Sequence, residues 1–259
     1  MSALTMYTQR FLALQLAFAH RVAALTVRPI DEVVLGYSAL YRILGLDWSF
    51  DAAHPVWQCY AKILQGDTDP DASQTHAFYL ALARSDQTPR APEGPRWGCF
   101  SYEYDGGARA VHMHFGNHDA PEPGALSSQR RATRLGELTA MFRHIREEYP
   151  DAQTVRGGSW LYSREGYRRL FPPAYSASAK TITPHCRSRS CWGQFLQSDW
   201  QVNEETAAIF LERVTALHSM GTAELTACFP RPTLSVEAPL SDFLDFYGIE
   251  AGGSSLHAT

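Results

Sequence analysis

The stretch WGCFSYEYDGGARAVHMHF, residues 97–115, decides the fold class. Apolar and polar residues alternate on both sides of Asp105-Gly106-Gly107. Such alternation around a glycine-rich turn is typical of a β-hairpin. A two-residue turn at 105–106 or at 106–107 places the same side chains on each face, because the two registers differ by two residues. We therefore predict an antiparallel strand pair with one apolar and one polar face.

The predicted polar face of this hairpin carries two histidines. Its members are Cys99, Ser101, Glu103, His112 and His114, and those of the apolar face are Phe100, Tyr102, Val111, Met113 and Phe115. Two histidines at i and i+2 on one strand can chelate a metal ion, and His118 and Asp119 follow closely. A metal-dependent enzyme is therefore one hypothesis. A third ligand at a recognisable spacing is missing, and His185 with Cys186-x4-Cys191 is not a zinc signature. We expect no bound metal.

The residues before the hairpin are predicted to be helical. Apolar residues recur every three or four positions, for example at Leu14, Phe18, Val22 and Leu25, which is the stripe of an amphipathic helix. The proline-rich stretch SDQTPRAPEGP then marks a boundary. We predict a helical N-terminal part over residues 1–90, an α/β domain over 91–250 and a disordered tail over 251–259.

After the hairpin the expected elements alternate between helices and strands. A long helix begins near Ser127 and ends before Pro150, a strand follows over 154–162, and a short helix carries Tyr167. A further strand is expected over 176–183. This order predicts an α/β (α+β) fold with a mixed sheet flanked by helices.

Composition excludes several classes of protein. Hydrophobic residues make up 45% of the 259 residues and charged residues 19%, as in globular proteins. The net charge of −4 argues against a nucleic-acid partner. The sequence has no apolar run that approaches the length of a membrane span. The five cysteines are an odd number at irregular spacing, which favours a reduced, cytoplasmic protein.

The stretch SSQRRATRLGEL, residues 127–138, places arginines where a helix disfavours them. Arg130, Arg131 and Arg134 fall in the first turns, where the helix dipole repels cations. The hydroxyls of Ser127 and Ser128, free backbone N–H groups and guanidinium groups together make a good site for an anion such as phosphate. A solvated basic face with local pairs, such as Arg134 with Glu137, is the alternative interpretation.

The order of elements over residues 108–183 resembles the central part of the GNAT N-acyltransferase family. The resemblance implies that acyl-CoA is the small-molecule ligand, with its pyrophosphate at the helix start. The residues that would hold it are Ser127, Ser128, Arg130, Arg131 and Arg134. It also implies that Tyr167, or Tyr162 before it, acts as the general acid. An acyltransferase-like protein is the leading hypothesis, and a non-catalytic protein that docks a partner on its helical surface is a third.

Overall fold

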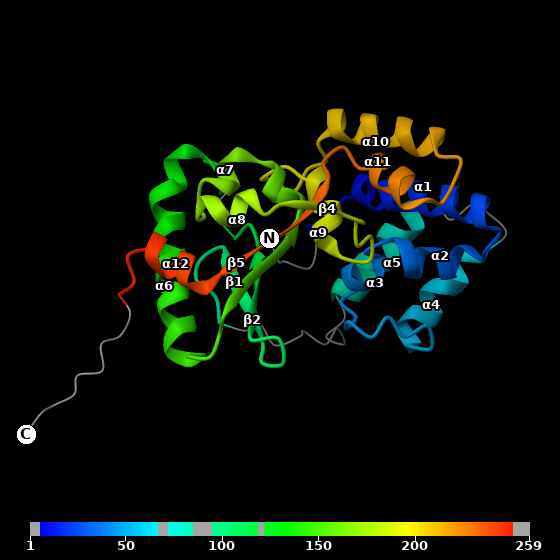
Figure 1. The fold of residues 1–259 in the computed structure, drawn as a ribbon. Helices are drawn as coiled ribbons and strands as arrows, with labels where there is room; N and C mark the ends of the chain where they lie inside the picture. The colour runs from blue at the N-terminus through cyan, green and yellow to red at the C-terminus, as the bar shows by residue number, and fades with distance from the viewer. Residues whose placement is uncertain (1–5, 67–71, 85–94, 119–121, 251–259) are drawn as a thin grey trace, which may run out of the picture. The chain divides into compact units, whose positions relative to one another are not determined.

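The computed structural model of the protein describes residues 6–66, 72–84, 95–118 and 122–250. Contacts divide the chain into two compact units. Unit 1 consists of Met1–Pro92 and Ile182–Thr233, and unit 2 of Glu93–Thr181 and Leu234–Thr259. The mixed sheet flanked by helices that the sequence predicts is present (Figure 1). The tail over 251–259 lies outside the described residues.

Unit 1 is helical. Its α-helices are α1 (Gln9–Thr26), α2 (Ile30–Tyr37), α3 (Leu40–Ile43), α4 (Pro55–Leu64), α5 (Ala72–Arg84), α9 (Arg189–Trp192), α10 (Glu204–Ala216) and α11 (Thr222–Cys228), with a 3₁₀ turn at Gly193–Phe195. The Thr8 hydroxyl accepts from the Phe11 N–H and caps α1. Between α2 and α3, Ser38 donates to the Val34 carbonyl, and Gln15 accepts from the Ala39 N–H at 2.8 Å. These bonds satisfy buried polar groups where the chain changes direction.

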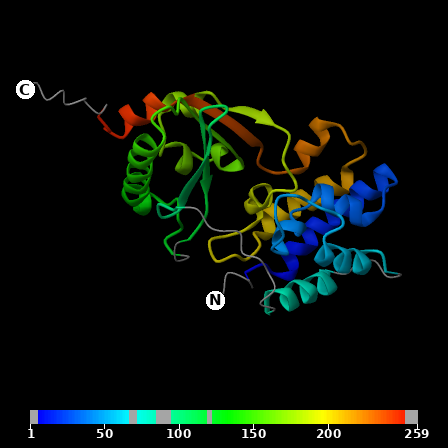
Figure 2. The same ribbon diagram turned by 90° about the horizontal axis from the view of Figure 1, so that it is seen from below.

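The core of unit 1 joins segments that are far apart in the sequence. Phe18 of α1 packs on Trp192, Phe210 and Phe229 at ring-centroid distances of 5.6–6.0 Å. Figures 1 and 2 show α10 and α11, in orange, beside α1, in blue. Residues 182–233 therefore pack with the N-terminal helices, whereas the predicted division kept 91–250 as one segment. Hydrophobic periodicity identifies an apolar face but not the segment that covers it.

Unit 2 is built on a five-stranded sheet. The strands are β1 (Phe100–Asp105), β2 (Ala110–Phe115), β3 (Thr154–Ser159), β4 (Lys180–Ile182) and β5 (Thr233–Pro239), in the spatial order β1-β2-β3-β5-β4. The β1–β2 and β3–β5 pairs are antiparallel, and β2 and β3 are parallel. The predicted strands over 154–162 and 176–183 are shorter than expected, because helical turns occupy 160–163 and 173–177.

The register of the hairpin confirms the predicted faces within β1 and β2. Cys99, predicted on the polar face, precedes β1 and is buried in the core of unit 2. Glu103 lies opposite His112, and Ser101 lies opposite His114. The loop is longer than the predicted two-residue turn, since Asp105 pairs with Ala110 and residues 106–109 connect them. The observed register differs from that of a 106–107 turn by two residues, so each side chain keeps its face. The Asp105 carboxylate accepts from the N–H groups of Gly107 and Ala108 and stabilises the loop.

One face of this sheet is covered by apolar side chains from unit 2. The remaining elements of the unit are α6 (Arg131–Glu148), α7 (Glu165–Arg168), α8 (Pro173–Ala177), α12 (Leu240–Phe246) and 3₁₀ turns at Ser128–Arg130 and Trp160–Ser163. Phe142 of α6 stacks on Phe243 of α12 at 4.7 Å, and both are fully buried. Val111, Val155 and Val236 complete this core from three strands.

We predict different effects for alanine at two neighbouring glycines of β3. A Cβ at Gly157 would collide with the hydroxyls of Tyr162 and Tyr175, whereas a Cβ at Gly158 would meet nothing within 4 Å. Gly157→Ala should therefore lower the free energy of unfolding by about 1–3 kcal/mol, the usual cost of overpacking. Gly158→Ala is the matched control and should change it by less than about 0.5 kcal/mol. Urea unfolding measures both, and equal effects would contradict the packing described.

Candidate functional site

The strands β2 and β3 separate part of the way along. Within the described strands they pair at three positions, Ala110 with Thr154, Val111 with Val155 and His112 with Arg156. β2 continues to Phe115 beside β1, and β3 continues to Ser159 beside β5. The facing edges at 113–115 and 157–159 therefore no longer form a ladder with each other. Backbone groups on such edges can bind an extended ligand.

The start of α6 lies at the end of the sheet where these strands part. α6 ends at Glu148 and β3 begins at Thr154, so the helix returns along the sheet antiparallel to β3. Eighteen residues of helix span about 27 Å and six residues of strand about 20 Å. The N-terminus of α6 therefore reaches the edge at which β3 ends.

The segment that enters α6 contacts α7 and the residue that follows it. The Leu126 carbonyl accepts from Nη2 of Arg169 at 3.3 Å, and a Cβ on Gly166 would lie 3.0 Å from the same oxygen. Phe115, at the end of β2, contacts Tyr167 edge-on with ring centroids 5.5 Å apart. The end of β2, the entry to α6 and the helix α7 are thus brought together.

The first turn of α6 has the composition of an anion site. It contains no acidic residue. Ser128 and Arg131 are exposed, and Arg130 is half-buried. Ser127 makes no capping hydrogen bond, and its buried hydroxyl has no hydrogen-bond partner among the described residues. A buried hydroxyl without a partner loses about 1–3 kcal/mol of hydration. An anion that accepts a hydrogen bond from the Ser127 hydroxyl would recover this loss.

Arg134 has a different environment from the arginines before it. It is 1% exposed, and its Nη1 lies 2.6 Å from Oε2 of Glu137. The same carboxylate oxygen accepts from the Cys99 N–H at 3.2 Å. Gly98 has a φ of +59°, and a Cβ there would collide with the Glu137 carboxyl group. Arg134 therefore forms the local pair that was the alternative interpretation of this stretch, and it joins α6 to the residues before β1.

Tyr162 and Tyr167, the two predicted general acids, lie in the core of unit 2. Each is 2% exposed. The Tyr162 hydroxyl is 2.9 Å from that of Tyr175, and the rings of Tyr162 and Tyr167 are 5.1 Å apart. Burial raises the pKa of both phenols well above their ordinary value. Both side chains therefore hold a proton at neutral pH, and neither can act as a base.

His112 and His114 lie on the opposite, polar face of the sheet. Nε2 of His114 is 3.6 Å from Oε1 of Glu103, and both side chains are largely exposed. His118 is 3.1 Å from Nη1 of Arg96, and Asp119 lies outside the described residues. The residues described include no group of three His, Cys, Asp or Glu arranged to hold a metal ion. The polar face thus presents a histidine pair beside one carboxylate.

Two features of this region were not recognised from the sequence. One is Tyr175, whose hydroxyl meets that of Tyr162 beside Gly157. The other is the separation of β3 from β2, which occurs as the chain enters Gly157-Gly158. Adjacent glycines inside a predicted strand were the available signal, because glycine in a strand marks a bulge or a close approach.

Comparisons with known proteins assign no family to the chain. No protein-family model, curated protein or solved structure matched it. Among the helices of the described residues, none combines the length and the apolar character needed to cross a membrane. A functional proposal therefore depends on the geometry of unit 2.

Stability measurements on two arginines of α6 should separate their roles. Arg134→Ala leaves the largely buried Glu137 carboxylate without its ion-pair partner, so the free energy of unfolding should fall by about 3 kcal/mol or more. Arg131→Ala removes an exposed cation from the positive end of the helix and should leave stability unchanged or raise it by less than about 1 kcal/mol. Denaturant unfolding compares the two. Similar values would mean that Arg134 is not held as described.

Proposed function

We propose that unit 2 binds an extended, phosphate-bearing small molecule such as acyl-CoA and acts as an acyltransferase-like protein. The observation that carries this proposal is the separation of β2 from β3 beside the N-terminus of α6. The chain order β2, α6, β3, α7 is also the order on which the resemblance to the GNAT family rests. The resemblance and the geometry therefore point to one region of the unit.

The phosphate group of the ligand binds at the start of α6. The hydroxyls of Ser127 and Ser128 and the guanidinium groups of Arg130 and Arg131 supply the donors. The backbone N–H groups of these two arginines already donate to the Ser127 and Ser128 carbonyls. Each cation at this end of a helix costs about 0.3–1 kcal/mol. A hydrogen bond to a charged phosphate contributes about 1.5–3 kcal/mol, so binding outweighs the repulsion. Arg134 is outside this set because it pairs with Glu137.

The extended part of the ligand lies along the parted strands. The arm of CoA between its phosphates and its sulfur contains amide groups, which can pair with a strand edge as an added strand does. The edges at 113–115 and 157–159 are the two that part. A Cβ at Gly158 would meet nothing within 4 Å, so the backbone of β3 can be approached closely at this residue.

The acyl end of the ligand is directed toward the tyrosine cluster. When an amine attacks the thioester, the C–N bond forms and the C–S bond breaks. The amine nitrogen loses one proton to solvent, the departing thiolate takes one from its donor, and solvent returns a proton to that donor. Tyr167 lies against Phe115 of β2, and Tyr162 lies against Gly157 of β3. We assign one of these phenols as the donor, because both remain protonated at neutral pH. Both are buried, so this role requires the acyl group to enter the cluster.

We also assign the protein to a reducing, cytoplasmic compartment. All five cysteines of the chain are free thiols in the structure, and thiols persist where glutathione and thioredoxin keep them reduced.

Binding of CoA should depend on the arginines at the start of α6 and not on those further along it. We expect CoA to raise the melting temperature, and Arg130→Ala and Arg131→Ala each to weaken its Kd about tenfold or more, the equivalent of one charge-assisted hydrogen bond. Arg143→Ala is the matched control, because Arg143 is exposed on the same helix three turns later. Inorganic phosphate at equal ionic strength separates a general anion site from a CoA site.

Three results would count against this assignment. No thermal shift with CoA in the unaltered protein would exclude CoA binding and favour the non-catalytic interaction protein. Equal shifts in all three arginine variants would place the ligand elsewhere. Full acetyl transfer to an amine by both Tyr162→Phe and Tyr167→Phe would remove the tyrosines as proton donors.

A further inference from the structure

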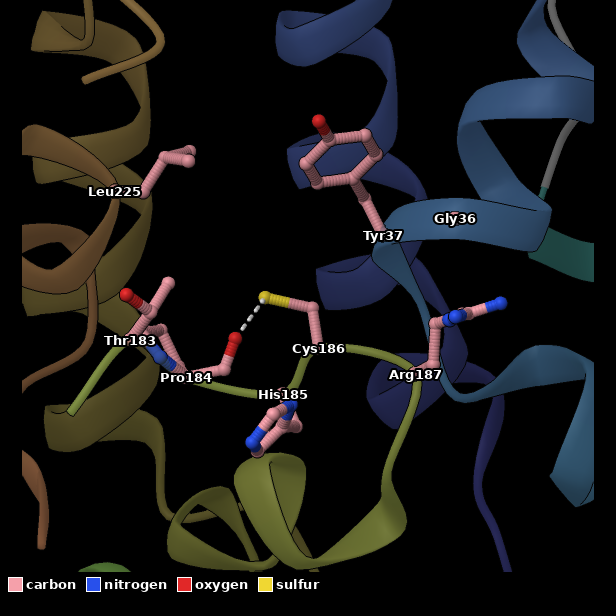
Figure 3. A pocket seen from close by; sticks show the side chains of 8 residues that line it. All are labelled: Gly36, Tyr37, Thr183, Pro184, His185, Cys186, Arg187 and Leu225. Atoms are coloured by element: carbon pink, nitrogen blue, oxygen red, sulfur yellow. Dashed lines mark hydrogen bonds between the residues drawn. The ribbon is translucent and has the colours of Figure 1, made fainter. Parts of the chain in front are cut away.

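Unit 1 contains a cavity of about 170 Å³ beside the loop that leads into α9. Its walls are formed by Gly36, Tyr37, Thr183, Pro184, His185, Cys186, Arg187 and Leu225 (Figure 3). The Cys186 sulfur points into the space between Tyr37 and Leu225, and its thiol donates to the Pro184 carbonyl at 3.6 Å. A nucleophilic atom therefore faces this cavity.

A second thiol lies behind the first. Cys191 is 2% exposed, and Cys186 lies close enough to contribute to the raised pKa of its thiol. Burial raises the pKa of Cys191, so this thiol stays protonated. The two cysteines thus differ in access, since Cys186 lines the cavity and Cys191 does not.

The backbone of each cysteine is fixed by a buried side chain. Nε1 of Trp192 donates to the Cys186 carbonyl at 2.7 Å, and Nε2 of Gln194 donates to the Cys191 carbonyl at 3.0 Å. Trp192 is fully buried in the aromatic core of unit 1, and Gln194 is 5% exposed. The same indole bond closes the turn over 186–192 and brings the two cysteines near each other, as a disulfide requires.

We propose that Cys186 and Cys191 form a reversible disulfide when a small hydroperoxide enters this cavity. The volume is many times the roughly 10–15 Å³ that one water molecule requires, so hydrogen peroxide fits. This site is in unit 1 and is independent of the CoA site proposed for unit 2.

The reaction proceeds in two steps. The Cys186 sulfur attacks a peroxide oxygen, so that an S–O bond forms, the O–O bond breaks and the leaving hydroxide takes the thiol proton as water. The Cys191 sulfur then attacks the sulfur of the sulfenic acid. The S–S bond forms, the S–O bond breaks and the leaving hydroxide takes the Cys191 proton as a second water. Two thiols lose two electrons, and one hydrogen peroxide is reduced to two waters.

The other cysteines of unit 1 provide internal controls. Cys59 is exposed on α4, so it reports whether the peroxide treatment was effective. Cys228 is buried, and its thiol donates to the Arg213 carbonyl at 3.9 Å. Cys186 lies close enough to contribute to the raised pKa of the Cys228 thiol, so Cys228 is the competing partner that the experiment must distinguish.

Peptide mapping of the full chain after hydrogen peroxide treatment tests this proposal. Trypsin cleaves after Arg187 and Arg189, between the two cysteines, so residues 181–187 and 190–213 form separate peptides. We expect them to be recovered as a linked pair lighter by two hydrogen atoms, which a reductant separates. Cys228→Ser should retain this link. In Cys191→Ser, the Cys186 sulfenic acid should persist and react with dimedone.

Several outcomes would overturn the proposal. A link between peptide 181–187 and the peptide that contains Cys228 would show that Cys228, and not Cys191, is the disulfide partner of Cys186. Cys186 that remains reduced while Cys59 is oxidised would show that peroxide does not reach the cavity. Oxidation of Cys191 in Cys186→Ser would show that access does not depend on Cys186. Mapping of the unaltered protein decides the first two without any variant that must fold.

Discussion

Three residue pairs join β2 to β3, and the arrangement of unit 2 depends on where this pairing stops. Before that point Val111 and Val155 lie side by side and bury the apolar face of the sheet. β3 pairs with β5 along its whole length, so beyond this point only its other edge leaves the ladder. There the end of β2 meets the Tyr167 ring through Phe115. Backbone groups that leave a ladder must find other partners or solvent. We propose an extended ligand as the partner of this edge.

The arginines near the start of α6 need negative groups close to them. Arginines at the start of a helix are unfavourable unless something negative is close. For Arg134 the negative group is Glu137, held in place by the Cys99 N–H and by the absence of a Cβ at Gly98. For Arg131, which is exposed at the start of α6, we propose an exogenous phosphate as the negative group.

Local signals in the sequence predicted local structure well. The faces of the hairpin were predicted because alternation and a glycine-rich turn lie within twenty residues, and a register shift of two residues leaves faces unchanged. The cap of α10 is equally local, because the Asn203 side chain accepts from the Thr206 N–H at 2.9 Å and asparagine is a favoured N-cap residue. Both features depend only on neighbouring residues.

Features that depend on distant contacts could not be predicted in this way. The packing of Phe18 on Trp192 and Phe229 assigns residues 182–233 to unit 1, and an apolar stripe does not specify its partner. The burial of Arg134 depends on the left-handed backbone of Gly98, which lies before β1. Cys186 and Cys191 are near each other because the Trp192 indole donates to the Cys186 carbonyl and closes the turn between them. Cys-x4-Cys spacing alone does not specify this turn.

Backbone amide hydrogen exchange with and without CoA tests the central claim most directly. If CoA binds between the parted strands, it should slow exchange at residues 113–115 and 157–159 and at the start of α6, over 127–131. Exchange at 110–112 and 154–156, which already pair in the ladder, should change little. Protection confined to other parts of the chain, or none at saturating CoA, would contradict the account.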